Sequence, residues 1–366
     1  MPQTEISHFR IAGIASAVPS STSNFSDVVA AFGEEAAKKI GDMSGVKIRH
    51  VVPADGSLCT SDLCAAAAHK LLSDLGWHSD SIDGLIFVSQ TPDYILPATA
   101  CVLHARLGLP KHCAAFDVNL GCSGFVYGLW LAAQMLAAGG CARVLLLAGD
   151  TISRIAGQQD RAVLPLFGDA GTATALEREP GAPPTWFDLG TDGTGYDKLI
   201  VPAGGFRNPR TPETSKRRPR DDGNLRSDEE LFMGGTDIFT FTLREVPVLI
   251  RNALGQSGWS ASDVDAFVMH QANRFMLQQI GKKAKLDPER VVIALEEFGN
   301  TSSASIPLAI TAQLARTLRE KAQKVILAGF GVGYSWGSAC LTLGPIIVSD
   351  LTIVEPREKN NDSQSP

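Results

Sequence analysis

Short runs of apolar residues alternate with longer amphipathic stretches along most of the chain. The runs VLLLAG (144–149), AFVMH (266–270) and KVILAG (324–329) are rich in branched apolar residues, which is typical of buried strands. In TSDLCAAAAHKLLSDLG (60–76) and REVPVLIRNALGQSG (244–258), apolar residues recur every three or four positions, which predicts helices. Strands that alternate with helices indicate an α/β fold in which helices cover the sheets.

This pattern repeats once along the chain. GWHSDSIDGLIFVSQ starts at Gly76 and GWSASDVDAFVMHQ starts at Gly258, so the two copies are 182 residues apart (258 − 76). Each copy runs Gly-Trp, four residues, an apolar residue, Asp and then a strand-like run. ARVLLLAGD (142–150) and QKVILAGFG (323–331) repeat at nearly the same offset. Two matches at one offset predict a duplicated α/β unit.

Irregular stretches indicate where the halves meet and where the periodic pattern stops. Proline and glycine interrupt EREPGAPPTW (177–186), which predicts a boundary between an N-terminal half, 1–178, and a C-terminal half, 179–350. We expect residues 351–366, with their polar end EPREKNNDSQSP, to form a disordered tail. The loop-like stretch 203–230 carries a run of Arg and Lys residues. It is either a solvated insertion or a cationic surface for an acidic partner.

Composition and charge narrow the function. The formal net charge of −6 argues against a nucleic-acid-binding protein. No apolar run is long enough to span a membrane, and the first residues make a poor signal peptide, so we expect a cytoplasmic protein. The seven cysteines are odd in number and irregularly spaced, as expected for reduced thiols.

A metal site is the first alternative for these cysteines. Cys101 and Cys113 lie near His104 and His112, but their spacing matches no known zinc-ligand pattern. The sequence LPATACVLHARLGL (96–109) has the pattern of a helix that buries Cys101 as a small apolar residue. We therefore expect no metal.

One cysteine lies between two glycines and is the first candidate for catalysis. AAFDVN (114–119) has the pattern of a strand and SGFVYGLWLAAQMLAAGG (123–140) that of a helix, so Cys122 would lie at a helix N-terminus. Unpaired N–H groups and the helix dipole favour an anion there, and we expect a lowered pKa for the thiol. Gly121 and Gly124 would permit the sharp turn of a nucleophile elbow. Cys122 is either a nucleophile or a small buried residue.

Two polar residues at the ends of predicted elements are the next candidates. His270 ends the strand-like run DAFVMH, and Asn300 follows a glycine in EEFGNTSSASIPLAI, where a helical pattern begins. Both side chains could project into a cleft between the halves. Taken singly, His270 could instead be a core residue, and Asn300 a helix cap.

Together, the motifs GCSGF, HQAN, FGNTSSAS and GFGVGYSWGSA resemble those of the β-ketoacyl-acyl-carrier-protein synthase III family. The motifs begin at residues 121, 270, 298 and 329, in the family's order, so the resemblance covers nearly the whole chain. It implies an α/β, thiolase-like, duplicated α-β-α-β-α five-layer sandwich. The glycine-rich segment does not have the spacing of a dinucleotide-binding loop.

The resemblance also implies a mechanism. Cys122 would attack a starter acyl thioester and hold the acyl group covalently. His270 and Asn300 would stabilise the enolate formed when malonyl-acyl-carrier protein loses carbon dioxide. The backbone N–H groups of Cys122 and Val332 would hold the oxyanion. The family's pathway is fatty acid biosynthesis. No cofactor is implied, since coenzyme A arrives as the substrate's thioester.

The resemblance assigns further positions to substrates and partners. Positions matching substrate or coenzyme A contacts are Arg161, Thr236, Phe239, Ala272, Asn273 and Phe330. Leu96 matches a residue that lines the acyl pocket of the neighbouring subunit, which implies a homodimer. Candidate residues for docking the carrier protein are Arg274, Lys216, Arg217 and Arg218.

Departures from the family pattern leave alternatives open. Lys39 and Met43 stand in the segment where the family places a tryptophan and an arginine that grip coenzyme A. The starter could therefore arrive on coenzyme A or on a carrier protein. A pathway-specific relative could transfer the acyl group to a polyketide, amine or hydroxyl acceptor, and a non-catalytic subunit is a third alternative. We assign no second catalytic role to Cys340. Residues 80–96 supply no clear counterpart of the glutamate base of related hydroxymethylglutaryl-type synthases, since the nearest candidate, Asp93, stands in a loop-like stretch.

Overall fold

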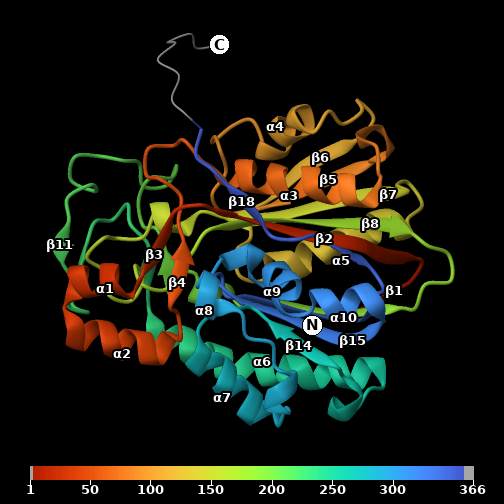
Figure 1. The fold of residues 1–366 in the computed structure, drawn as a ribbon. Helices are drawn as coiled ribbons and strands as arrows, with labels where there is room; N and C mark the ends of the chain where they lie inside the picture. The colour runs from red at the N-terminus through yellow and green to blue at the C-terminus, as the bar shows by residue number, and fades with distance from the viewer. Residues whose placement is uncertain (1–2, 358–366) are drawn as a thin grey trace.

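The computed structural model describes residues 3–357, which form two sheets stacked between layers of helices (Figure 1). The first sheet has seven strands: β17 (Ile347–Val348), β2 (Phe9–Pro19), β8 (Ala170–Arg178), β7 (Arg143–Asp150), β5 (Gly84–Val88) and β6 (Ala114–Val118) in order, with β18 (Thr352–Val354) also on β2. The second has five strands in the order β1 (Gln3–Ile6), β9 (Thr185–Thr191), β16 (Ser335–Leu343), β15 (Gln323–Gly331) and β14 (Ala266–Met269).

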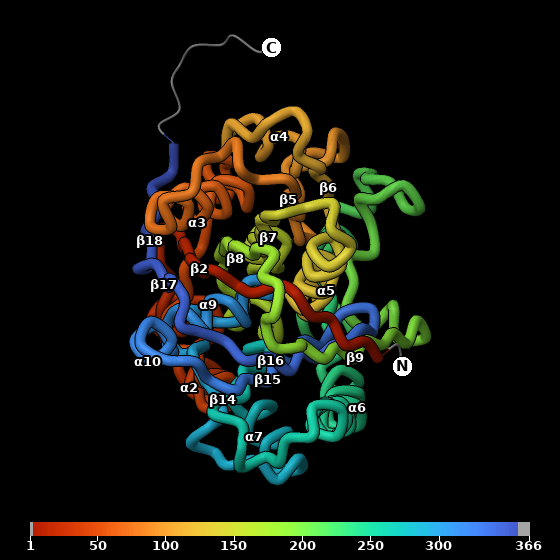
Figure 2. The backbone as a smooth tube through the Cα atoms, turned by 90° about the vertical axis from the view of Figure 1, so that its right-hand side faces the viewer, coloured from red at the N-terminus to blue at the C-terminus, as the bar shows by residue number. Residues whose placement is uncertain are grey.

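Helices fill the three remaining layers (Figures 1 and 2). The outer face of the seven-stranded sheet is covered by α3 (Thr60–Leu75) and α4 (Thr99–Arg106). The outer face of the five-stranded sheet is covered by α6 (Gly235–Ser257), with α7 (Arg274–Ala284) alongside. Between the sheets lie α5 (Gly124–Ala137) and α9 (Ser305–Gln313), each in contact with both. This layering confirms the five-layer α-β-α-β-α prediction.

The remaining elements are short. Beside the layers lie α1 (Phe25–Phe32), α2 (Glu34–Ser44), α8 (Leu295–Phe298), α10 (Ala315–Glu320), and the strand pair β3 (Thr22–Asn24) and β4 (Ile48–His50). The predicted loop 203–230 is indeed irregular. It contains only the two-residue strands β11 (Arg218–Pro219) and β12 (Leu225–Arg226), and it is flanked by β10 (Leu199–Ile200) and β13 (Phe232–Met233).

The two halves repeat each other in detail. Helices α3 and α6 both end at a left-handed glycine, with φ of 64° and 68°, and a tryptophan follows each. A basic side chain covers each indole: Arg143 lies 4.1 Å from the centre of the Trp77 ring, and Lys324 lies 5.1 Å from that of Trp259. The two basic residues lie at the starts of corresponding strands, as the first residue of β7 and the second of β15, so the repeat seen in the sequence extends to side-chain contacts.

The cores lie between the layers. One apolar cluster surrounds α5 and α9 between the sheets, a second lies under α3 and α4, and a third lies under α6 and α7. Every residue of β5 is buried, which explains why this strand is a continuous apolar run rather than an alternating one. The helices of the central layer, α5 and α9, begin shortly after Cys122 and Asn300, two of the candidate site residues.

The first strand of the chain pairs in the sheet of the C-terminal half, and the last strands of the described chain pair in the sheet of the N-terminal half. The predicted boundaries at residues 178 and 350 do not include this exchange. Strand β1 pairs with β9 in the five-stranded sheet, whereas β17 and β18 pair with β2 in the seven-stranded sheet. Residues 352–354 therefore belong to a strand rather than to the tail expected from 351 onwards, and residues 358–366 lie outside the described part. Segments of two to four residues are too short to show a strand period.

Helix α4 corrects a second expectation. The helix is present, but Cys101 is exposed on it rather than buried. The buried residues of this helix are Thr99, Ala100 and Leu103, so the apolar face differs from the one expected.

Candidate active site

Cys122, His270 and Asn300 line one cavity between the halves. The cavity volume of about 80 Å³ has room for only a few water molecules. All three residues are at most 6% exposed. Phe330 and Ala272 line the same cavity, Thr242 contributes from beyond the first turn of α6, and Met276 contributes from the first turn of α7. Residues that are far apart in the sequence therefore converge on one narrow, largely apolar space.

Two neighbouring segments hold Cys122 in place. The turn between β6 and α5 is closed by a hydrogen bond from the N–H of Gly124 to the carbonyl of Gly121, at 2.7 Å. The glycine-rich end of β15 packs directly on the cysteine. A Cβ added at Gly331 would lie 2.7 Å from the Cβ and 2.8 Å from the Sγ of Cys122, so only glycine fits there.

The electrostatics of Cys122 differ from the sequence-based expectation. Burial raises the pKa of the thiol to about 11, although the N–H groups of Val332 and Cys122 and the hydroxyl of Ser302 act in the opposite direction. The nearby carboxylate of Asp150 raises it further. The prediction of a lowered pKa is wrong because it took account of the helix terminus and not of the loss of water.

His270 is held as a neutral ring. It follows β14, and its Nδ1 lies 2.7 Å from the hydroxyl of Ser305, at the start of α9. Its ring meets Phe330 edge-on, with centroids 5.5 Å apart. Burial lowers the pKa of the imidazole to about 3, although the carbonyl of Ser302 favours the protonated ring. At neutral pH the imidazole therefore carries no charge.

Asn300 has a fixed amide orientation. Its backbone is bonded on both sides to the segment Leu166–Gly168, with N–H to Leu166 at 2.9 Å and carbonyl to Gly168 at 3.1 Å. Its Oδ1 accepts the N–H of Ser302 at 3.0 Å. Because the oxygen is engaged, Nδ2 is the amide atom left to donate to a molecule in the cavity.

Ser302 and Asp150 belong to this site, although the sequence analysis did not identify them. Ser302 has a left-handed backbone, with φ of 51°, and is buried. Asp150 ends β7 and is completely buried. No motif marks a serine that must adopt a positive φ, and the run SSAS gave no reason to prefer one hydroxyl over another. Asp150 could be recognised only from the residues that surround it in the folded structure, and not from its sequence context.

Of the other candidate substrate positions, some line the cavity and some lie outside it. Ala272, Asn273 and Phe330 line the cavity, and Asn273 also caps α7 by accepting the N–H of Met276 at 2.7 Å. Phe239 faces away from the cavity and stacks on Phe275 with centroids 5.6 Å apart. Thr236 and Arg161 are exposed outside the cavity. Leu96 is 78% exposed and does not reach the cavity of its own chain.

The candidate docking cations are largely engaged with acidic residues. Arg274 forms an ion pair with Glu296. In the loop 203–230, Lys216 and Arg218 pair with Glu213, and Arg217 pairs with Glu230. The loop is thus folded on its own acidic residues rather than presenting a free cationic run.

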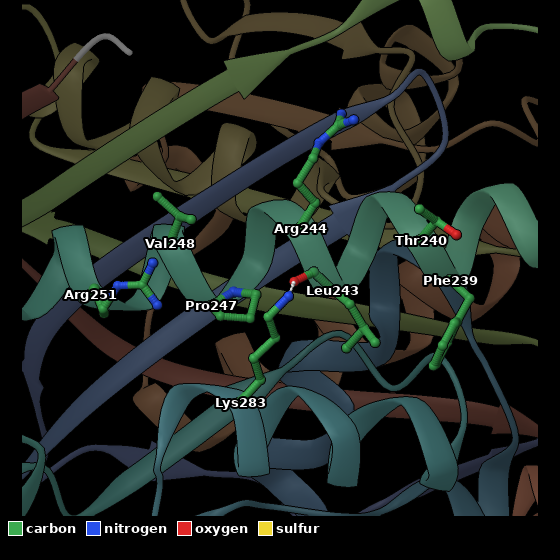
Figure 3. A pocket seen from close by; sticks show the side chains of 8 residues that line it. All are labelled: Phe239, Thr240, Leu243, Arg244, Pro247, Val248, Arg251 and Lys283. Atoms are coloured by element: carbon green, nitrogen blue, oxygen red, sulfur yellow. Dashed lines mark hydrogen bonds between the residues drawn. The ribbon is translucent and has the colours of Figure 1, made fainter.

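A separate groove runs between α6 and α7 (Figure 3). Its walls are apolar at Phe239, Leu243 and Pro247. Arg251 lies at one end, and Lys283 reaches across from α7 to donate to the carbonyl of Leu243 at 2.9 Å. The N-terminal parts of the same two helices line the buried cavity. The groove therefore lies along the elements that hold the candidate site.

The described residues contain neither a metal site nor a membrane-spanning helix. Residues 3–357 contain no group of three His, Cys, Asp or Glu side chains placed to hold a metal ion. Within the same range, no helix is long and apolar enough to span a membrane. All seven cysteines are unpaired.

Known proteins match the chain along most of its length. The family described as 3-oxoacyl-[acyl-carrier-protein] synthase III matches residues 116–193, and its C-terminal part matches residues 254–343. The β-ketoacyl-[acyl-carrier-protein] synthase III of Caldanaerobacter subterraneus subsp. tengcongensis is 36% identical over 299 residues. That match covers 81% of this chain and 87% of the relative.

Solved structures give the same result. The 3-oxoacyl-(acyl-carrier protein) synthase of Burkholderia xenovorans LB400 is 46% identical with a TM-score of 0.91, covering 96% of this chain and 99% of that one. The priming β-ketosynthase of the R1128 polyketide pathway is 25% identical with a TM-score of 0.78, covering 93% and 97%. The chain belongs to the β-ketoacyl-acyl-carrier-protein synthase III family of thiolase-fold acyltransferases.

Proposed function

We propose that this chain joins a starter acyl thioester to malonyl-acyl-carrier protein with loss of carbon dioxide, in fatty acid biosynthesis, and that Cys122 carries the acyl group. The observation that carries the proposal is the convergence of a thiol, a neutral imidazole and a free amide donor on one buried cavity. A covalent intermediate divides one difficult condensation into two easier steps.

Acyl transfer to Cys122 requires a site for the oxyanion. The N–H groups of Val332 and Cys122 both interact with the thiol sulfur, so they lie where a carbonyl under attack would place its oxygen. Gly331 allows the Val332 segment this close approach. We assign these two N–H groups to the oxyanion hole.

Condensation requires stabilisation of an enolate. His270 donates from Nε2 when the Ser305 hydroxyl donates to Nδ1, and Asn300 donates from Nδ2. Neither donor carries a charge, so no proton has to leave the site when carbon dioxide departs. In a dry cavity, each such donor is worth about 3 kcal/mol of barrier.

The acceptor could instead belong to a specialised pathway. The R1128 priming β-ketosynthase has the same fold, and Lys39 and Met43 depart from the family's coenzyme A contacts. The second candidate is therefore transfer of the acyl group to a polyketide, amine or hydroxyl acceptor. The intact triad favours either enzyme over a non-catalytic subunit.

We also propose that the protein works as a homodimer in the cytoplasm, with no resident cofactor. Strand β6 is an edge of the seven-stranded sheet, and the segment Tyr94–Leu96 is 60–80% exposed although it is apolar. Pairing two copies along this edge would cover the segment, and would allow Leu96 of one copy to reach the other's acyl pocket. The free cysteines fit a reducing compartment.

The carrier protein needs a cationic surface near the cavity. We propose that the acidic carrier docks along the groove between α6 and α7, where Arg251 and Lys283 flank apolar side chains. This moves the docking role away from Lys216, Arg217 and Arg218, whose charges are paired within the loop. Arg274, which is bonded to Glu296, would support α7 rather than bind the carrier.

Mass spectrometry of the intact protein tests the proposed function. Incubation with a panel of acyl-coenzyme A and acyl-carrier thioesters should add one acyl group to the wild type and none to Cys122→Ala. Added malonyl-acyl-carrier protein should then release a β-ketoacyl product, whereas release of another product class would favour the second candidate. Labelling that persists in Cys122→Ala would exclude the assigned nucleophile.

A further inference from the structure

Asp150 is a completely buried carboxylate with no assigned role in the reaction. It ends β7 and is 0% exposed. Its Oδ1 accepts the backbone N–H of Gln90 at 2.7 Å, the hydroxyl of Ser89 at 3.2 Å and the hydroxyl of Thr91 at 3.4 Å. Its Oδ2 accepts the backbone N–H of Ser303 at 3.1 Å. Burial of a carboxylate is costly unless hydrogen bonds satisfy it, and here each oxygen bonds to a different half of the chain.

Ser303 lies in the short segment that orients both proposed enolate donors. At one end of this segment, the side-chain oxygen of Asn300 accepts a backbone N–H two residues later, at 3.0 Å, which leaves Nδ2 free to donate. At the other end, the hydroxyl of Ser305 lies 2.7 Å from Nδ1 of His270. Because Ser303 lies between these two contacts, its bond to the buried carboxylate fixes the backbone that orients both donors.

The loop after β5 contacts the turn that carries the nucleophile. A Cβ added at Gly121 would lie 2.0 Å from Oε1 of Gln90, so the Gln90 side chain packs against the residue just before Cys122. The backbone N–H of Gln90 also makes the shortest of the four bonds to Asp150. One carboxylate therefore joins the loop behind the nucleophile to the segment behind the enolate donors.

All four of these partners donate to Asp150, which explains why the residue is a carboxylate. An ionised carboxylate only accepts, and it offers about four lone-pair sites, whereas an amide of the same shape replaces one oxygen by a donor. Three donors meet Oδ1 and one meets Oδ2. The amide of Asp150→Asn should therefore keep its oxygen on the side of the loop after β5, with its NH2 against the N–H of Ser303.

We propose that Asp150 is a positioning residue for the condensation step, which it serves by anchoring Ser303 to the loop after β5. The anchor holds Asn300 and His270 in register with Cys122. Preorganised donors lower a barrier only while they point at the place where the charge develops. Loosening the donor segment should therefore slow decarboxylation and spare acylation, because acylation uses the two backbone N–H groups assigned to the oxyanion hole.

This inference rests on the proposed function, and its test separates the two half-reactions. Cys122 is first acylated with a starter thioester, and the mass of the intact protein gives the fraction of molecules that carry the acyl group. Malonyl-acyl-carrier protein is then added, and the carbon dioxide released is measured per acylated molecule. Asp150→Asn should acylate within about threefold of the wild-type rate but release carbon dioxide at least tenfold more slowly, with little change in KM for the malonyl substrate.

The rate per acylated molecule distinguishes positioning from a merely structural role. Loss of stability would reduce the fraction of molecules that acylate, but it would not change how fast each acylated molecule releases carbon dioxide. Asp150→Ala removes the acceptors on both sides without adding an NH2, so it reports the same ratio if Asp150→Asn does not fold.

Asp188→Asn is the matched control. Asp188 is also 0% exposed, and it lies in β9, where it accepts the side-chain N–H of Asn252 at 3.1 Å. Neither residue lines the cavity. The same change in a buried carboxylate should therefore leave the release of carbon dioxide per acylated molecule unchanged.

Each remaining outcome decides between the two proposals. Wild-type release of carbon dioxide by acylated Asp150→Asn, or equal slowing in Asp188→Asn, would overturn the inference. Failure of both Asp150 variants to acylate would also overturn it, because the carboxylate would then support the nucleophile or the fold as a whole. A wild type that does not acylate, or that releases no carbon dioxide, would contradict the proposed function itself, and the inference would fall with it.

Discussion

The pH dependence of Cys122 reactivity follows directly from its burial. With a pKa of about 11, only about one thiol in 1,000 is ionised at pH 8, against roughly a quarter for an ordinary thiol with a pKa of about 8.5. The thiolate is the form that reacts with iodoacetamide. We therefore expect the alkylation rate to rise about tenfold for each pH unit from pH 7 to 10, without a plateau.

The assay follows the mass of the intact protein during alkylation, with Cys122→Ala measured in parallel to subtract the other cysteines. A free thiol peptide serves as the control and should level off near pH 9. His270, with a pKa of about 3, stays neutral throughout and should add no inflection. A plateau for Cys122 below pH 9 would show that its thiolate exists at neutral pH. It would refute the argument that the loss of water at Cys122 outweighs the effect of the helix terminus.

Three other changes probe separate parts of the site. Gly331→Ala should reduce acylation at least tenfold, as measured by mass, because the new Cβ overlaps the nucleophile. Asn300→Asp should still acylate but should decarboxylate the malonyl thioester at least 100-fold more slowly, because an acceptor replaces a donor; equal loss in both steps would contradict the role. Arg251→Glu with Lys283→Glu should raise KM for malonyl-acyl-carrier protein severalfold at unchanged kcat, whereas Arg316→Glu, on the exposed helix α10, should not. An unchanged KM in the groove variant would rule out docking there.

Most of the architecture could be predicted from the sequence. The repeated Gly-Trp pattern predicted two similar halves, and the structure repeats even the basic residue stacked on each tryptophan. The strand and helix expected on either side of Cys122 are present as β6 and α5. These features were predictable because each depends on the spacing of apolar residues within one element or on the residues that end a helix. The site residues were found through their motifs, and the structure brings Cys122, His270 and Asn300 to one cavity.

Other features depend on contacts that no local pattern reports. The pKa of Cys122 is raised by groups that surround it from several elements. The cations of the 203–230 loop could be counted in the sequence, but their pairing with Glu213 and Glu230 could not. Ser302 stands in a run of small polar residues, where only its backbone angle and its neighbours distinguish it.

The crossed termini have a consequence for synthesis of the chain. Strand β2 is made among the first twenty residues, but its partners β17 and β18 are the last strands of the described chain. One edge of β2 must therefore stay open until residues 347–354 have left the ribosome. Such distant pairing slows folding and leaves an unpaired edge exposed to other chains. The two similar halves cannot mature one after the other, because the N-terminal sheet needs β17 and β18, which follow every strand of the C-terminal sheet.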